Sequence, residues 1–316
     1  MHRSELLPDT GTAKELWHRR AVIKGMKWKK YVMYRVKKVL NHNSVIAVKS
    51  ADNKEYLIMG KGAGFGKKVS ERIAKRPEDV VYSLQEVTER GDAREMVKAI
   101  SPICLELANE VLNQAESEFG NIDRRILFPM ADHIEYAVRR IKNEEQISNP
   151  LTEDIRVLFY KEYKVAKCME KLLRDSLGVQ IDEHEVGYIA LHIHSAIEDE
   201  KVSQAMLIAG AVRECISLVE EHTGKKIDVM TLSYNRLMNH VRYMVARALN
   251  GEKLKLNMND YMEIKFPKAF EISRKICSEI GHSIHRELDE VEIGYLAMHI
   301  ERVVNDEINE SEGKEV

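Results

Sequence analysis

The sequence predicts a multidomain protein in which a small all-β antiparallel domain precedes two tandem all-α helical bundles. Two repeated stretches predict the bundles. Residues 181–200 (IDEHEVGYIALHIHSAIEDE) recur as residues 288–307, and residues 130–140 recur as residues 237–247, both at an offset of 107 (288 − 181 and 237 − 130). A repeat of about a hundred residues is too long for a solenoid unit and indicates two tandem domains of one fold. Short strands between turn residues predict the β domain.

Charge is divided unevenly along the chain. Residues 1–87 hold 19 Lys and Arg against 9 Asp and Glu, a net charge of +10. The remaining residues hold 30 against 42, a net charge of −12, so the overall value of −2 hides the asymmetry. No acidic residue occurs from Leu16 to Ala51. A basic module on an acidic body favours a polyanionic partner for that module over a merely solvated tail.

Residues 1–32 form an N-terminal arm without a clear hydrophobic period. They are either a disordered arm or an over-extended start, with Met26 or Met33 as the initiator. The arm lacks the apolar core of a signal peptide, and no apolar run in the chain is long enough for a membrane helix, so a cytoplasmic protein is expected. The 4 cysteines form no CxxC pair, which favours reduced thiols over disulfides or zinc.

The β domain is assigned to residues 33–87. The β-rich runs YRVKKVL and SVIAV flank residues 41–43 (Asn-His-Asn), and because Asn tolerates turn conformations this pattern predicts a hairpin. Residues 51–54 predict a second turn, EYLIMG predicts a third strand, and residues 79–84 predict a fourth. Such a small sheet is marginal alone and gains from packing on a copy of itself.

Helices are predicted beyond a polar linker at residues 88–95. Apolar residues there recur at three- and four-residue spacing, which is typical of helices facing a core. The first bundle is assigned to residues 92–202 and the second to residues 203–316. Helices in the first bundle are predicted over residues 100–119 (starting at Ser101-Pro102), 124–143, 158–178 and 182–198. Matching patterns recur in the second, so each bundle should contain four or five helices.

The stretch GKGAGFGKK after the third strand is rich in glycine. It lacks the GK[ST] ending of a P-loop and joins strands rather than a strand and a long helix, which disfavours nucleotide binding. Glycines let a backbone approach a ligand closely, Phe65 can stack on a base, and Lys67 and Lys68 can meet phosphates. Asn41 and Asn43 can bond to base edges. The alternative is a plain turn with a packed Phe65, and the basic charge favours the ligand-binding interpretation.

Each repeat holds two matched histidines with equal spacing: His133 and His192 in the first, His240 and His299 in the second. A lone helical histidine is usually structural, but four histidines kept between two diverged copies indicate a shared role. Neutral imidazole can accept a phosphoryl group, because its ordinary pKa of about 6.5 leaves the nucleophilic form available at cytosolic pH. The added negative charge would break one helix contact or recruit arginines into another; Arg139, Arg140, Arg242 and Arg247 are near in sequence.

Metal binding by these histidines is disfavoured. His194 lies two positions after His192 and therefore points to another side of the helix. Glu301 stands at the matched position of the second copy, and no HExxH motif or carboxylate cluster accompanies the histidines. The same observations disfavour a metallohydrolase.

Together these motifs resemble the bacterial transcriptional antiterminators of the BglG type. VKKVLNHNSVIAV followed by IMGKGAGFGKK is similar to the family's co-antiterminator RNA-binding domain. The DHI, LHIH, NHV and MHIE contexts of the histidines are similar to its two regulation domains of the phosphotransferase system (PTS). The resemblance covers residues 33–316, and GKGAGFGKK and LHIHSA are most similar to the glucose-type members. The additional arm and His194 depart from the family's pattern.

The resemblance implies an RNA-binding regulator, not an enzyme, with no cofactor and no metal. The β domain would dimerise and grip a hairpin in a nascent leader transcript, which prevents a terminator from forming in a sugar-utilisation or sugar-transport operon. The residues that match the family's RNA contacts are Asn41, Asn43, Gly62 and Phe65, with Lys37, Lys38, Lys67 and Lys68 as phosphate contacts.

The same resemblance implies that His133, His192, His240 and His299 are phosphorylation sites. The sugar-specific PTS transport enzyme would inactivate the protein through the first regulation domain when sugar is absent. The general PTS phosphocarrier protein would activate through the second, a requirement that glucose-type members can relax. The phosphates would act by shifting the contacts of a homodimer.

Two other functions are compatible with parts of the sequence. A DNA-binding activator can carry the same regulation domains, but no recognition helix is visible in the strand-rich N-terminal part. A PTS phosphocarrier component would explain the histidines and leave the basic β domain without a role. Binding to hairpin RNA or to duplex DNA separates these hypotheses.

Overall fold

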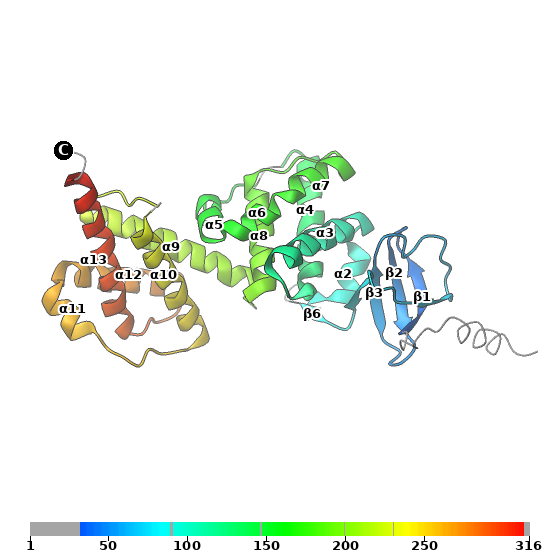
Figure 1. Cartoon of the computed structure of the whole chain (residues 1–316), viewed down its shortest axis with the longest axis horizontal. Coiled ribbons are helices and arrows are strands. Elements are labelled where there is room, and N and C mark those ends of the chain that lie inside the picture. Colours follow the sequence, from blue (N-terminus) through cyan, green and yellow to red (C-terminus); the bar gives the residue numbers. More distant parts are fainter. Residues whose placement is uncertain (1–31, 89–90, 146, 199, 230, 313–316) are drawn as a thin grey trace, which may run out of the picture. The chain divides into compact units, whose positions relative to one another are not determined.

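The computed structural model describes residues 32–88, 91–145, 147–198, 200–229 and 231–312. The chain divides into two compact units, one up to Val81 and one from Tyr82 onward. Figure 1 shows the strands of the first unit and the helices of the second. The predicted N-terminal arm lies outside the described residues, apart from Val32.

The first unit is built on a five-stranded sheet with the order β4-β1-β2-β3-β5. Its strands are β1 (Met33–Val39), β2 (Ser44–Lys49), β3 (Glu55–Met59), β4 (Arg72–Ala74) and β5 (Val80–Ser83). β1 pairs antiparallel with β2 and β4, and β2 pairs antiparallel with β3. The predicted antiparallel domain and its hairpin at residues 41–43 are confirmed. β4 was not predicted, because three residues are too few to show an alternating pattern.

The core of this sheet is formed by side chains from three neighbouring strands. They are Tyr34, Val45, Ala47 and Ile58. Aromatic and β-branched side chains suit such a pleated, half-buried surface. The loops at the strand ends, which carry Asn41, Asn43, Gly62 and Phe65, lie outside this core.

A β-bulge interrupts β1 at Lys37. Val36 pairs with Ala47 and Lys38 pairs with Ile46, which leaves Lys37 as an additional residue in β1. Exposed and buried side chains alternate before this point. Because a bulge shifts that alternation by one residue, Lys37 and Lys38 are both exposed.

The segment predicted as a linker contains regular structure where it is described. β6 (Val87–Thr88) pairs antiparallel with β7 (Gly91–Asp92), and α2 (Ala93–Ala99) follows directly. Asp92 caps α2, because its side chain accepts a hydrogen bond from Arg94 N. The linker prediction is therefore wrong over residues 91–95, since a short hairpin and a helix cap have the polar composition of a linker.

The first helical repeat confirms most of the predicted helices. Its elements are α3 (Pro102–Phe119), α4 (Leu127–Lys142), α5 (Thr152–Leu158), α6 (Tyr160–Ala166), α7 (Cys168–Leu177) and α8 (Glu183–Glu198). Ser101 is the N-cap of α3 and Pro102 occupies its first turn, as predicted. The single helix predicted over residues 158–178 is wrong, and these six helices exceed the four or five that were predicted for one bundle. Phe159 has φ −116° and ψ 44° and separates α5 from α6, and α6 gives way to α7 at Lys167.

The second repeat follows the same plan. Its helices are α9 (Val202–Thr223), α10 (Leu232–Asn250), α11 (Asn259–Lys265), α12 (Pro267–Ser283) and α13 (Val291–Glu312). α11 begins 107 positions after α5 (259 − 152), and α12 begins 107 positions after α6 (267 − 160). Phe266, the counterpart of Phe159, also leaves the helical conformation, with φ −135° and ψ 58°. The predicted tandem all-α bundles are confirmed, and the duplication extends to local backbone geometry.

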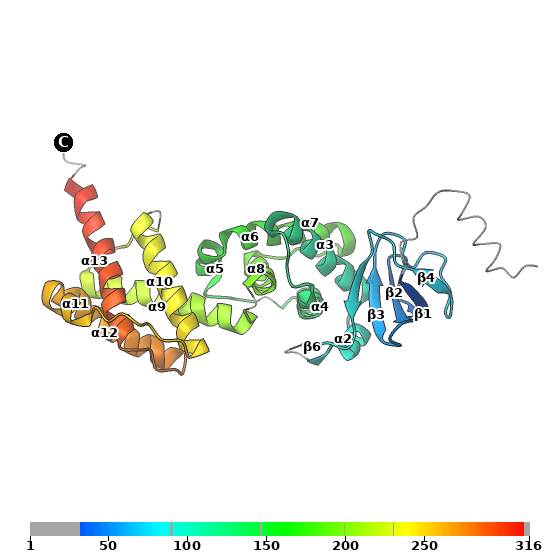
Figure 2. The ribbon, with the colours of Figure 1, turned by 60° about the horizontal axis from the view of Figure 1, so that its bottom comes forward.

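The two helices that carry the repeated motif occupy equivalent places. α8 packs against α3, α4, α5 and α6, and Figure 2 looks nearly along its axis. α13 packs against α10, α11 and α12. Residues on α8 and α13 therefore face several helices at once.

One described helix, α9, is long and apolar enough to cross a membrane by length and composition. The core helix of a folded domain passes the same test. α9 contributes Ile208, Val212 and Cys215 to the core of the second repeat, and it packs against α10 and α12.

Candidate functional site

The turn between β1 and β2 and the glycine-rich loop after β3 are bonded to each other. Asn43 Oδ1 accepts a hydrogen bond from Gly62 N at 2.8 Å, and the carbonyl of Asn43 accepts one from Gly60 N at 2.9 Å. Asn41 Oδ1 accepts hydrogen bonds from Asn43 N at 2.9 Å and from Ser44 Oγ at 2.7 Å. The oxygens of both asparagine side chains therefore shape this pair of loops.

Two glycines in the loop are required by its geometry. A Cβ at Gly64 would lie 2.0 Å from the carbonyl oxygen of Asn41. Gly62 has φ 71°, in the left-handed region that favours glycine. Gly64 N also donates to the carbonyl of His42 at 2.9 Å. The glycines thus allow one loop to lie directly against the other.

Phe65 projects from the tip of the glycine-rich loop. Its side chain is 69 % exposed, and its ring meets the edge of His42 at a centroid distance of 5.5 Å. The alternative of a plain turn with a packed phenylalanine is therefore wrong. An exposed aromatic ring beside polar groups offers a surface on which a base can stack.

The predicted phosphate-contacting lysines surround this pair of loops in sequence: Lys37, Lys38, Lys67 and Lys68. Lys37 and Lys38 are exposed on the bulge of β1. Lys37 forms an ion pair with Glu55, and Lys67 Nζ lies 2.9 Å from Glu71 Oε1, so these two charges are partly neutralised. The structure brings the asparagines, Gly62 and Phe65 into one loop pair, whereas Lys37 and Lys38 stand on a strand.

The structure brings His133 and His192 of the first repeat together. The ring of His133, on α4, lies 5.4 Å from that of His192, on α8, measured between centroids. The two residues are 7 % and 2 % exposed. Tyr188, one turn before His192, places its ring 5.4 Å from His133. The two histidines that the sequence repeat singled out in this copy therefore lie in contact.

The second repeat places His240 and His299 in the same way. Their ring centroids are 4.8 Å apart, and the ring of Tyr295 lies 6.3 Å from His240. Burial, together with His299 and Arg247, lowers the pKa of His240 to about 3. Burial, with Arg302 and Arg236, also lowers the pKa of His299. Both imidazoles are neutral at cytosolic pH, the form whose nitrogen lone pair can act as a nucleophile.

A glutamate and an arginine accompany each histidine pair. Arg140 forms a buried ion pair with Glu185. Arg247 donates two hydrogen bonds to Glu292, from Nε at 2.7 Å and from Nη2 at 2.9 Å. Neither glutamate was predicted as a site residue, although each lies seven positions before a predicted site histidine, at the shared offset of 107. A seven-residue spacing places side chains on one face of a helix, and this signal was available in the sequence.

His194, the histidine without a counterpart, lies in a separate buried site. Its Nδ1 is 3.0 Å from Glu162 Oε1, and its Nε2 is 3.1 Å from Glu200 Oε2. Its ring packs on Phe159 at a centroid distance of 4.3 Å. Although burial lowers the pKa of His194, the two carboxylates outweigh it and raise that pKa above its ordinary value. The two carboxylates bond to opposite nitrogens of the ring, so they do not converge on one metal ion.

No three His, Cys, Asp or Glu side chains in the described part of the chain are placed to hold one metal ion. The histidine pairs are instead accompanied by arginine. Guanidinium groups bind phosphate in a fixed, forked geometry. The neutral imidazoles of His240 and His299, with Arg247 nearby, therefore suit acceptance of a phosphoryl group.

Comparison with known protein families matches both parts of the chain. The family described as CAT RNA binding domain matches residues 34–90. The family described as PRD domain matches residues 105–196 and 213–303. These matches coincide with the sheet and with the two helical repeats.

Individual relatives are similar over most of the chain. Protein GlcT of Staphylococcus epidermidis is 30 % identical over 279 residues, which is 84 % of this chain and 95 % of that protein. Transcription antiterminator LicT of Bacillus subtilis is 28 % identical over 274 residues, 85 % of this chain and 99 % of that protein. A crystal structure of GlcT CAT-PRDI has 28 % identity and a TM-score of 0.45, and it covers 52 % of this chain and 99 % of that chain.

Proposed function

Because this chain belongs to the BglG-type transcriptional antiterminators, close to the glucose-type members, we infer that its exposed loop pair and its histidine pairs are the two ends of one regulatory switch. The protein is an RNA-binding antiterminator whose activity is regulated by PTS-dependent phosphorylation. Its role is regulatory. The assignments of single residues, partners and domain limits follow below as proposals.

The RNA contact is assigned to the loop pair of the first unit. Phe65 would stack on an unpaired base, and Asn41 and Asn43 would place the loop backbone against the hairpin. Gly62 provides the turn that this approach needs. Lys37, Lys38, Lys67 and Lys68 would meet phosphates, which predicts binding that weakens as salt concentration rises.

Phosphorylation is assigned to His133 and His192 in the first repeat and to His240 and His299 in the second. The observation that carries this assignment is the recurrence of one histidine pair, with the same arginine and glutamate, in both repeats. A structural histidine in one domain needs no such copy in the other. A phosphoryl group would add a charge between about −1.5 and −2 to a buried helix contact.

The remaining assignments follow from this switch. The proposed domains are residues 33–87 for RNA binding and residues 92–202 and 203–316 for regulation. The protein would act as a homodimer in the cytoplasm, on a hairpin of a nascent leader transcript. Its phosphoryl donors would be the sugar-specific PTS transport enzyme and the general PTS phosphocarrier protein.

A binding experiment tests the proposed function. The full chain is titrated with a fluorescent leader-hairpin RNA before and after phosphorylation by the purified PTS relay, with duplex DNA of equal length as the control. We expect salt-sensitive binding to the hairpin that changes with phosphorylation. RNA binding that ignores phosphate would leave the histidines with a structural role, and binding to duplex DNA alone would point to a DNA-binding activator.

A further inference from the structure

The two repeats hold their buried glutamate in two different settings. In the first, Glu185 Oε2 lies 3.1 Å from His133 Nε2, within hydrogen-bond distance, while Glu185 Oε1 is paired with Arg140. In the second, Glu292 Oε2 lies 3.7 Å from His240 Nε2, and both of its oxygens are held by Arg247. Both repeats contain the same histidine, glutamate and arginine at the offset of 107. They differ in the distance between the carboxylate and the imidazole.

The position of the glutamate determines whether Nε2 of the histidine is available to accept a phosphoryl group. An ionised carboxylate only accepts hydrogen bonds, so the proton of His133 sits on Nε2, facing Glu185. The Nε2 of His240 is buried and has no hydrogen-bond partner within the described residues. Exposure does not separate the two histidines, since their side chains are 9 % and 10 % exposed.

We propose that Glu185 and Glu292 are positioning residues that gate phosphoryl acceptance at Nε2 of His133 and His240, and that Arg140 and Arg247 pass from this carboxylate to the phosphoryl group. The first repeat has the gate closed, because Glu185 contacts His133 as well as Arg140. The second has it open, because Glu292 is hydrogen-bonded to Arg247 and lies 3.7 Å from Nε2 of His240. This inference rests on the proposed function, because it presupposes that the two histidines are phosphorylated.

The electrostatics of the buried groups support an exchange of partners. Glu185 and Glu292 are 1 % and 2 % exposed, and a buried carboxylate is stabilised only while it is paired. A phosphoryl group on Nε2 would bring about two further negative charges to within a few ångströms of that carboxylate. Arginine binds phosphate through the same forked geometry that it uses for carboxylate. The arginine is therefore expected to leave the glutamate and bind the phosphoryl group, which carries the larger negative charge.

The chemical step can be written for a small donor, potassium phosphoramidate. The Nε2 lone pair of His240 attacks phosphorus while the ring keeps its proton on Nδ1. The phosphorus–nitrogen bond of the donor breaks, and its electron pair leaves with ammonia. His133 reaches the same state only after its proton moves to Nδ1 and Glu185 withdraws.

The test measures the extent of phosphorylation of the full chain by phosphoramidate, site by site, with mass spectrometry and phosphorus NMR. Glu292→Gln removes the negative charge that would repel the phosphoryl group. It also leaves Arg247 without its carboxylate partner, so that Arg247 can bind the phosphoryl group. We expect occupancy of His240 to rise about tenfold at limiting donor, the effect of removing one nearby like charge. The phosphoryl group should be on Nε2, and His240 of the wild type should be labelled before His133.

The control variant is Glu290→Gln, an exposed position two residues away on the same segment, which should leave occupancy unchanged. Arg247→Lys keeps the charge but loses the fork, and it should lower occupancy several-fold. The melting temperatures of the phosphorylated and unphosphorylated proteins give a second, independent test. Phosphorylation should stabilise Glu292→Gln more than it stabilises the wild type, because it restores a partner to Arg247.

The outcomes separate the inference from the proposed function. A glutamate with only a structural role predicts unchanged or lower occupancy in Glu292→Gln, and that result would overturn the gate while leaving His240 a phosphorylation site. If Glu292→Gln does not fold, a normal occupancy in Arg247→Lys overturns the inference, and a lowered one supports it. No phosphate on His240 of the wild type would overturn the gate and the site assignment together.

Discussion

His194 and Glu162 form a hydrogen bond of 3.0 Å, and the second repeat has neither of these two residues at the matched positions. The matched positions there hold Glu301 and Ala269. Glu200, from the segment that joins α8 to α9, bonds to the other nitrogen of the ring. The interaction therefore involves the segment that connects the first repeat to the second.

The protonation of His194 makes stability depend on pH. Its pKa is raised in the folded state by Glu162 and Glu200 against the effects of burial and of Arg242. A raised histidine pKa stabilises the fold fully below its ordinary value of 6.5, and the contribution is lost as pH rises through the folded value. Thermal unfolding of the wild type from pH 6 upward should therefore show a loss that His194→Gln does not show. Parallel curves for the two proteins would contradict this prediction.

Gly294 and its counterpart Gly187 should respond differently to the same substitution. A Cβ on Gly294 would lie 2.7 Å from Asn259 Oδ1, whereas a Cβ on Gly187 would meet only Ile155 Cγ2, at 3.8 Å. Gly294 N also donates to Asn259 Oδ1 at 3.0 Å. Gly294→Ala should lower the free energy of unfolding by about 1–3 kcal/mol through overpacking. Gly187→Ala should leave it unchanged or raise it by up to about 1 kcal/mol, since alanine favours helix.

Urea unfolding of the two variants checks this prediction, and each serves as the other's control. An equal loss in both would mean that glycine is kept for its backbone conformation and not for the contact with Asn259.

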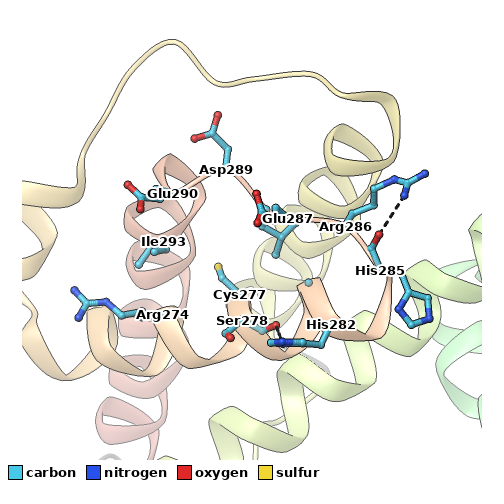
Figure 3. Close-up of a pocket in the computed structure, with 12 residues that line it drawn as sticks. Arg274, Cys277, Ser278, His282, His285, Arg286, Glu287, Asp289, Glu290 and Ile293 are labelled. Carbon is cyan, nitrogen blue, oxygen red and sulfur yellow. Dashed lines mark hydrogen bonds between the residues drawn. The ribbon is translucent and has the colours of Figure 1, made fainter.

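His285 has a left-handed backbone conformation, and the matched position in the first repeat is occupied by a glycine in the same conformation. It has φ 53°, and Gly178 at the matched position has φ 66°. His285 lies on the exposed turn that joins α12 to α13 (Figure 3). It lines a cavity of about 670 Å³ together with residues of both helices. His285→Gly should raise the free energy of unfolding by about 0.5–1 kcal/mol, because the left-handed region is costly for residues with a Cβ.

The reverse exchange, Gly178→Ala, should cost about 1 kcal/mol in the same measurement. A stability loss in His285→Gly would show that the imidazole makes a contact worth more than the backbone strain.

Phe65 should matter for RNA and not for stability. If it stacks on a base, Phe65→Ala should weaken hairpin binding by about 1–3 kcal/mol. Because the side chain is 69 % exposed, the melting temperature should hardly change. Val69, which is 65 % exposed in the same stretch, provides the matched control, and Val69→Ala should retain affinity. Equal affinities of the two variants would remove Phe65 from the RNA contact.

Periodicity and repetition in the sequence were sufficient for the architecture. The offset of 107 residues located both repeats, and helix starts such as Ser101-Pro102 were explicit in the sequence. Short elements escaped prediction for physical reasons. β4 has too few residues to alternate, and Asp92 looks like a linker residue until its bond to Arg94 N identifies a cap.

The sites were only partly predictable. The repeat singled out His133, His192, His240 and His299, and the structure adds that the two histidines of each repeat lie in contact. The distance between a carboxylate and an imidazole was not predictable, because Glu185 and Glu292 share one pattern and adopt different settings. Side-chain position depends on packing from several helices, which no spacing in one helix records.

The contact between Gly64 and Asn41 has a consequence for redesign. A Cβ on Gly64 would collide with the carbonyl of Asn41, and Gly62 is bonded to the side chain of Asn43. Neither loop can therefore be exchanged with a relative's loop on its own. A chimaera intended to read a different hairpin would have to transplant residues 41–44 and 60–66 as one cassette, and libraries that randomise only one of the two segments would yield mostly misfolded loops.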